Sequence, residues 1–307
     1  MHKRLFNQAR ITVDVTPITP LLIKSGMENA DPALPDMSFV RTHNPQHGEV
    51  VYIPGSSLKG VLRSYTEKIL RSLDIPCCDP LMTNKQWDGK FVGSCGRKND
   101  KEPENTESGA GSILYSLYSC YACKMYGSTK IASRVLFTDG HAQAEYKTEK
   151  RTGVAIDRVT ASALKGGLFD YEVVTSGTFR CDIFLSNFQL WQFGLVGVAL
   201  RDLDEGYVQL GFAKSRGLGR VSAKVLSIEI TYTKKPAVEG QLWGVGMDDS
   251  LRREYRFLEN DFVDIDMSPE THGLRTKYSW KDDSPFASIV SEKSPCWKVF
   301  LNQGVSS

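Results

Sequence analysis

Apolar and polar residues alternate along several short segments of the chain. In residues 10–18 every second residue is apolar, which predicts a strand with one buried face. Residues 21–23 either extend that strand or begin another. Residues 221–233 form a β-branched run that follows a glycine-rich turn. We expect strands at residues 10–18, 50–53, 134–139, 171–174, 177–184 and 221–233.

Two other segments repeat their apolar residues at helical spacing. The first follows Pro54-Gly55, and either Ser56 or Ser57 is expected to be its N-cap. The second covers residues 188–203 and is apolar on most sides, which is typical of a core helix. The order is then strand, helix, strand, strand, helix, strand. This order predicts an α+β fold, a ferredoxin-like (RRM-like) palm over residues 1–233.

Four segments do not fit that pattern and are expected to be additions to the palm. They are a long loop at 24–49, a cysteine-rich insertion at 77–127, a protruding arm at 142–168 and a C-terminal extension at 234–307. The extension has no clear period and is expected to pack on the palm or on a neighbouring molecule.

The arm is basic and apolar by turns. Lys147, Lys150 and Arg151 precede an apolar stretch that contains Arg158. Exposed apolar side chains beside cations suit insertion between nucleobases and contact with a phosphate backbone. The alternative is a charged surface hairpin with no binding role.

Composition narrows the class of protein. The chain has 307 residues, of which 41% are hydrophobic and 24% charged, as in globular proteins. Its net charge of +2 does not indicate nucleic acid by itself, so any basic surface must be local. We expect a cytoplasmic protein without membrane contact, because no apolar run reaches membrane-spanning length and no signal sequence is evident. In a reducing compartment the seven cysteines favour thiols or a metal site over disulfides.

Five cysteines lie within the 77–127 insertion. Cys120 and Cys123 form a C-x-x-C pair, the spacing in which two thiolates bind one tetrahedral zinc ion. Cys95 and one of the adjacent residues Cys77 and Cys78 complete a set of four, and Cys78 is our choice. We therefore predict a structural Zn²⁺ site that stabilises an insertion without a core of its own. Unligated thiols and a redox-active pair are the alternatives.

Two glycine-containing stretches bring cations and hydroxyls together. The stretch 211–220 joins three glycines to Lys214, Arg216 and Arg220, and bent backbone of this kind forms an anion-binding concavity. At the first predicted helix, free N–H groups lie beside Lys59 and Arg63. A basic surface turn and a solvated lysine are the plain alternatives. The candidate phosphate contacts are Ser56, Ser57, Lys59, Arg63, Lys214, Ser215, Arg216 and Arg220.

Several of these motifs together resemble a known family. Ile53-Pro-Gly-Ser-Ser-Leu-Lys-Gly60 precedes Gly211-Phe-Ala-Lys-Ser-Arg-Gly-Leu-Gly-Arg220, as in the repeat-associated mysterious protein (RAMP) superfamily. Cys120-x-x-Cys123 before Met125-Tyr-Gly-Ser128, and Asp157-Arg-Val-Thr160, narrow the match. With these the chain resembles backbone subunits of type III CRISPR effector complexes, including the III-D branch. The resemblance covers about residues 8–233.

The resemblance implies a palm that lies along a CRISPR guide RNA beside other RAMP and large subunits. The arm would enter the duplex of guide and target RNA, with Arg158 among the RNA contacts. In many members an aspartate before the Pro-Gly-Ser motif supports cleavage of target RNA with Mg²⁺ or Mn²⁺. Asp36 best matches that aspartate and Asp31 is the second candidate, although the loop here lacks the family's commoner glycine-rich form.

Three functions remain open on these grounds. The first is a guide-binding backbone subunit that also acts as a metal-dependent endoribonuclease on target RNA. The second is the same scaffold without cleavage. The third is a stand-alone ribonuclease that processes guide RNA, with His43 or His47 as general acid or base. The cysteine-rich insertion and the arm favour the first two.

Overall fold

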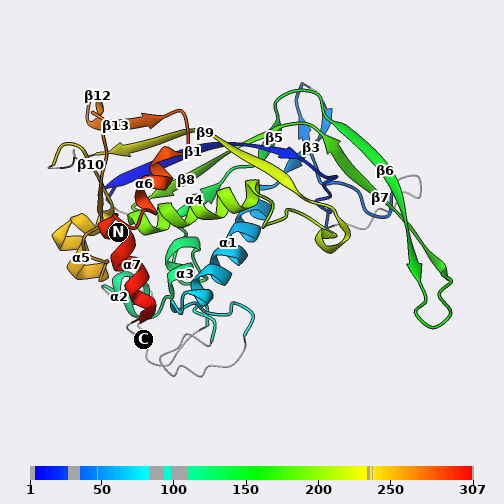
Figure 1. Cartoon of the computed structure of the whole chain (residues 1–307), viewed down its shortest axis with the longest axis horizontal. Coiled ribbons are helices and arrows are strands. Elements are labelled where there is room, and N and C mark those ends of the chain that lie inside the picture. The colour runs from blue at the N-terminus through cyan, green and yellow to red at the C-terminus, as the bar shows by residue number, and fades with distance from the viewer. Residues whose placement is uncertain are drawn as a thin grey trace.

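The computed structural model describes residues 4–26, 35–46, 48–82, 93–97, 109–233, 236 and 238–305. Figure 1 shows a body in which helices cover one face of a long sheet, and a two-stranded arm that projects from one end. None of the helices in these ranges is both long and apolar enough to cross a membrane.

The central strand of the sheet is β1 (Asn7–Pro17). It pairs antiparallel with β8 (Phe179–Ser186) on one side and β9 (Val221–Tyr232) on the other. β4 (Val135–Phe137) pairs with β8 beside the main path. The described strands follow the order β12 (Glu270–His272), β13 (Arg275–Trp280), β9, β1, β8, β5 (Gly140–Ala142), β3 (Gly48–Ile53) and β2 (Arg41–Asn44).

Two helices, α1 (Gly55–Ser72) and α4 (Leu190–Asp204), lie on one face of this sheet. Alternate residues of β1, including Ile11 and Val13, are fully buried against them. The residues between point to the other face, where Arg10 forms an ion pair with Asp182. The predicted α+β class with an antiparallel sheet is therefore confirmed, and the period-two pattern explains it.

The C-terminal segment is part of the same body. β13 extends the main sheet along β9, and the Phe300 ring stacks on Trp191 of α4 with centroids 5.0 Å apart. It thus packs on the palm, one of the two placements expected. Its other elements are β10 (Gln241–Trp243), η2 (Val245–Met247), α5 (Asp249–Tyr255), β11 (Phe262–Asp264), α6 (Ser284–Ile289) and α7 (Pro295–Val305).

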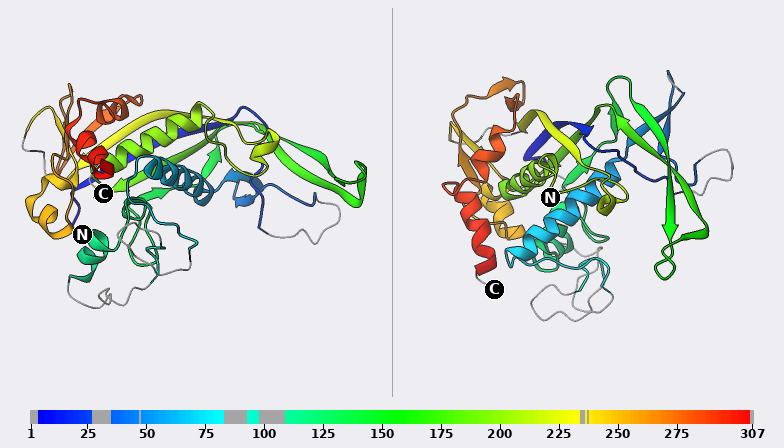
Figure 2. Two further views of the ribbon diagram at one scale, coloured as in Figure 1. Left: turned by 60° about the horizontal axis from the view of Figure 1, so that its bottom comes forward. Right: turned by 45° about the vertical axis from the view of Figure 1, so that its right-hand side comes forward.

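The arm is a hairpin of β6 (Lys147–Ile156) and β7 (Ala163–Ser176) that projects clear of the body (Figure 2). β7 continues well past the arm expected at 142–168, and it absorbs the separate strand expected at 171–174. Continuous pairing with β6 from Lys147 onward explains the difference. The strand expected at 134–139 is instead the short β4, followed by β5.

Two expectations of irregular structure were wrong. The segment 24–49 contains β2 and the start of β3, a hairpin whose polar sequence carries no alternation. The cysteine-rich segment contains α2 (Ala110–Leu117) and α3 (Tyr121–Tyr126). Met125 and Tyr126 of α3 are buried in the main core, so this insertion shares the core of the palm.

Candidate metal centre and nucleic-acid interface

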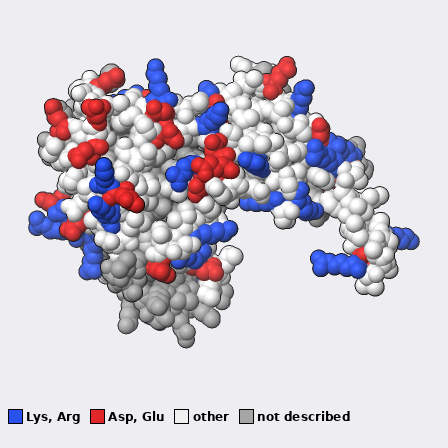
Figure 3. All heavy atoms as spheres, viewed as in Figure 1, with Lys and Arg blue, Asp and Glu red and all other residues white. Residues whose placement is uncertain are grey.

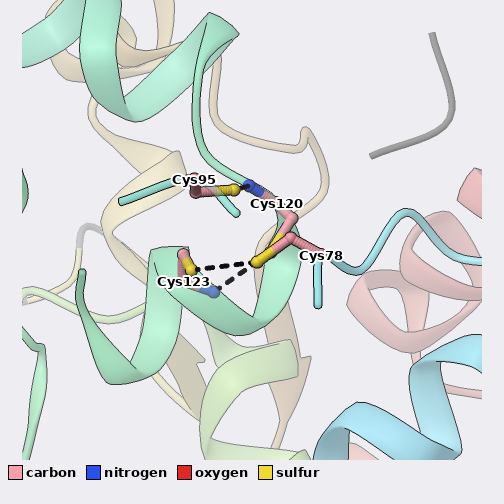
Figure 4. A group of neighbouring side chains, drawn as sticks. All are labelled: Cys78, Cys95, Cys120 and Cys123. Carbon is pink, nitrogen blue, oxygen red and sulfur yellow. Dashed lines mark hydrogen bonds between the residues drawn. The ribbon is translucent and has the colours of Figure 1, made fainter. Parts of the chain in front are cut away.

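The four cysteines chosen from the sequence meet in one buried cluster. The Sγ atoms of Cys78, Cys95, Cys120 and Cys123 all lie within 4.8 Å of one another (Figure 4). The adjacent Cys77 is outside this group, and its thiol lies near the Cys78 carbonyl. The structure therefore selects Cys78 over Cys77.

Backbone geometry around α3 arranges these sulfurs. Cys120 is the N-cap of α3, and its Sγ accepts a hydrogen bond from the Cys123 N–H at 3.4 Å. The Cys95 Sγ accepts from the Cys120 N–H at 3.3 Å. Hydrogen bonds from Cys123 first, then from the other neighbouring thiols, hold the pKa of Cys120 well below its usual range. The cluster thus favours a thiolate.

The donor set fits a metal ion such as zinc. Tetrahedral zinc with Zn–S bonds of about 2.3 Å needs sulfurs about 3.8 Å apart, and the Sγ atoms of Cys78 and Cys123 are 3.6 Å apart. Four sulfurs leave no open coordination position, so such a site would be structural. All four are buried, whereas a redox-active pair requires an accessible thiol.

Arg63 of α1 joins this cluster to the helix. Its guanidinium forms an ion pair with Glu67 at 2.9 Å, donates to the Gly127 carbonyl at 3.2 Å and approaches the Cys123 Sγ at 3.6 Å. The side chain that we expected to hold phosphate therefore has protein partners. A cation beside the thiolates would also partly offset the net negative charge of a metal bound by four cysteines.

Lys59 lies one turn before Arg63, and both residues line an open cavity of about 500 Å³ beside the cysteine cluster. The pKa of Lys59 is lowered by burial and by the nearby Arg63. Four residues with hydroxyl groups, Ser94, Ser128, Thr129 and Ser133, are among the others that line this cavity. A cation with hydroxyls is a suitable lining for a phosphate group.

The start of α1 differs from the prediction. Pro54 is the N-cap and offers no side-chain hydrogen bond, while Ser56 and Ser57 lie within the first turn. The Gly55 N–H donates instead to the Asp139 carboxylate at 2.8 Å. The cap therefore comes from the turn between β4 and β5. Ser56 is exposed and Ser57 half-buried, so both hydroxyls remain near the surface.

The glycine-rich stretch 211–220 is an ordered loop against the arm. Lys214–Arg216 form the short η1 helix, in which Lys214, Ser215 and Arg216 are all exposed. Gly211 and Gly219 have positive φ and carry their backbones against Leu22 and Leu210, where a Cβ would overlap. These glycines serve close packing in a turn.

The three cations of this loop have different surroundings. Burial and the nearby Lys68 of α1 lower the pKa of Lys214. Arg216 lies over the Phe212 ring at 5.4 Å, and Arg220 is exposed. Figure 3 shows Lys and Arg side chains along the concave edge between body and arm, and again at the tip of the arm.

The tip of the arm is an ordered turn with apolar residues in solvent. The Asp157 carboxylate accepts the N–H groups of Val159 and Thr160 at 2.7 and 2.9 Å. At this tip Val159 is 94% exposed and the adjacent Arg158 is exposed as well, while Leu168, further along β7, is 69% exposed. The predicted combination of apolar and basic residues is therefore present on this surface.

Asp36 lies at the base of the arm rather than in a free loop. Its exposed carboxylate accepts the backbone N–H of Asp170 in β7 at 2.7 Å. Among the described residues, no group of three acidic or histidine side chains surrounds it as a metal site would require. Asp31 and His47 lie outside the described residues. His43 is exposed in β2.

Sequence reasoning missed three side chains that organise this region. Asp139 caps α1, while Arg41 and Glu172 form an ion pair between β2 and β7. No pattern in the sequence indicates that Arg41 and Glu172, which are 131 positions apart, form an ion pair. The available signal was weak: Glu172 is an acidic residue inside an apolar strand pattern, and such a buried carboxylate needs a partner.

Comparison with known proteins agrees with these motifs. A curated protein, the CRISPR system Cms endoribonuclease Csm3 of Methanocaldococcus jannaschii, is 26% identical over 208 residues, which cover 62% of this chain and 68% of that protein. The family model of the RAMP superfamily matches residues 14–222. That range takes in the end of β1, α1, the cysteine cluster, the arm and the glycine-rich loop. The chain belongs to the RAMP superfamily.

Proposed function

We propose that this protein is a guide-RNA-binding backbone subunit of a type III CRISPR effector complex that also cleaves complementary target RNA. Its palm is ferredoxin-like: the strand order β9, β1, β8, β4 with α1 and α4 on one face supports this. The cysteine cluster holds one structural Zn²⁺. Other RAMP subunits and a large subunit are the expected partners.

The observation that carries the proposal is the surface where the glycine-rich loop meets the arm. A small cavity between them is lined by Phe169 and Tyr171 of β7 and by Phe212 and Arg216 of the loop. Exposed cations of η1 therefore lie at the base of an arm whose tip is apolar. A nucleic-acid strand along this edge would meet cations for its phosphates and apolar side chains for its bases.

Asp36 is the proposed catalytic carboxylate. In the reaction a target ribose 2′-OH attacks the adjacent phosphate, and the 5′-oxygen leaves. A divalent cation such as Mg²⁺ or Mn²⁺ would supply charge neutralisation on that phosphate. Within the described residues Asp36 belongs to no group of three metal ligands, so RNA phosphates and water must complete any metal shell there.

A scaffold without cleavage is the second candidate function. It is favoured by the contact of Asp36 with the Asp170 N–H, because this bond gives the carboxylate a structural role. The related Csm3 protein is named an endoribonuclease, which favours the first candidate.

Guide binding is tested in the assembled complex. Lys59→Ala and Arg216→Ala should each weaken RNA binding equally for all guide sequences and reduce the slope of log K against log salt by about 0.7–0.9. Lys298→Ala removes an exposed cation from α7, on the opposite side of the body from the arm, and is the control. A loss confined to particular sequences would contradict phosphate contact.

Cleavage is tested with Asp36→Ala. This variant should load guide and bind target normally while losing Mg²⁺-dependent cleavage. A target with 2′-deoxyribose at the scissile nucleotide should bind the wild-type complex and stay whole, because the internal nucleophile is absent. If Asp36→Ala cuts at the wild-type rate, Asp31→Ala is the next test. Should neither matter, the protein is a scaffold.

A further inference from the structure

An ion pair between the exposed Arg41 and the buried Glu172 joins the segment that carries Asp36 to the base of the arm. Glu172 of β7 is buried, and both its oxygens are bound by the Arg41 guanidinium, at 2.9 and 2.6 Å. One of those oxygens also accepts the Phe39 N–H at 3.1 Å. Such a bidentate pair fixes orientation as well as distance.

The backbone between these residues is held to the same strand. The Met37 N–H donates to the Asp170 carbonyl at 3.1 Å, and the Glu172 N–H donates to the Met37 carbonyl at 2.9 Å. Met37 thus forms a parallel bridge to Tyr171 of β7. On its other side Phe39 forms an isolated antiparallel bridge to Lys24, so the segment lies between β7 and the backbone at Lys24.

We propose that Arg41 and Glu172 are positioning residues for cleavage, which set the place of Asp36 relative to the arm. Asp36 lies next to Met37, so any movement of the arm base at 170–172 carries the Asp36 carboxylate with it. The arm is the part that would engage the RNA duplex. The ion pair therefore aligns the carboxylate with the duplex that the arm has entered. This inference rests on the proposed function.

The ion pair is built for this role rather than for stability. An ion pair whose arginine is partly exposed to solvent contributes little net stability. Because side chains alternate along a strand, Glu172 points away from the face of β7 on which Phe169 and Tyr171 meet the glycine-rich loop, and it is also distant from the arm tip. A misplacement of about 1 Å at a reacting group can cost about 100-fold in rate. Loss of the pair should therefore reduce cleavage more than binding.

The test uses Glu172→Gln in the assembled, guide-loaded complex. Glutamine keeps the shape, but its NH₂ group faces the guanidinium donors of Arg41. We expect cleavage at saturating target to fall about 10- to 100-fold, target affinity to change less than about 3-fold, and the amides of Met37 and Phe39 to exchange at least about 10-fold faster. Arg41→Gln combined with Glu172→Gln should cost no more than the worse single variant.

Glu149→Gln is the matched control, because Glu149 loses the same charge from an exposed ion pair with Arg151 on β6 of the same arm. It should leave cleavage, affinity and exchange unchanged. The inference is overturned if Asp36→Ala abolishes cleavage while Glu172→Gln cuts and exchanges as wild type. It is also overturned if Glu172→Gln reduces binding as much as cleavage. If Asp36→Ala itself cuts normally, the proposed catalysis fails first.

Discussion

Replacing Gly55 by alanine should destabilise the protein although alanine is the better helix former. A Cβ at Gly55 would overlap the Phe137 carbonyl oxygen and lie 2.8 Å from the Thr138 oxygen. These are backbone atoms of the turn between β4 and β5, so no side chain can rotate away. The variant would also strain the hydrogen bond from the Gly55 N–H to Asp139.

The magnitude follows from these opposing effects. Alanine gains about 1 kcal/mol in helix propensity, whereas overpacking costs about 1–3 kcal/mol and a weakened hydrogen bond about 1 kcal/mol more. We expect a net loss of about 1–3 kcal/mol in the free energy of unfolding, measured by urea denaturation. Gly60→Ala is the control, because Gly60 lies in the same helix with nothing within 4 Å of its Cβ position.

Gly60→Ala should therefore stabilise the protein by about 0.5–1 kcal/mol. Equal effects of the two variants would refute the packing argument. If Gly55→Ala kept its stability and lost only RNA binding, then Gly55 would serve the ligand instead of the turn.

Three further predictions test other parts of the structure. Elemental analysis should find one zinc per chain. Cys120→Ser should lose the metal and unfold the cluster, since metal binding at such sites contributes about 10 kcal/mol or more to folding. Cys77→Ser should keep the metal, and wild-type protein without zinc would contradict the site. Asp139→Ala should lower the free energy of unfolding by about 1 kcal/mol through the lost cap, while Ser57→Ala should change it little. If Ser57→Ala were the more destabilising variant, the cap would be the serine and not Asp139. Burial raises the pKa of Asp261 to about 7, so the unfolded carboxyl ionises first and stability should fall as pH rises from about 4 to about 7. Asp261→Asn should remove that slope.

Local periodicity was sufficient for the central part of the fold. β1 and β8 bury every second residue, β9 does so on either side of a register shift, and α1 buries residues mostly three or four apart, so their patterns are visible within a single element. The cysteines of the candidate zinc site could also be predicted from the sequence, because the spacing of Cys120 and Cys123 is typical of two ligands of one zinc ion.

Contacts between distant segments could not be predicted from the sequence in this way. The α1 cap comes from Asp139, 84 residues after Gly55, and the Arg41–Glu172 pair spans 131 residues. A capping serine was the local expectation, but here proline at the N-cap leaves the Gly55 N–H to a carboxylate from a neighbouring turn. The packing of the turn between β4 and β5 against the start of α1 therefore determines which residue caps the helix.

Lys59 and Arg63 show how one helical face can serve two purposes. Their spacing of four residues suggested a shared phosphate site, yet Glu67 lies four residues further along and pairs with Arg63. That pair holds the guanidinium toward Cys123 and leaves Lys59 facing the cavity. Because Arg63 also contacts the cluster, an RNA phosphate bound at Lys59 would lie next to the metal site. Loss of the metal should then weaken RNA binding as well as the fold.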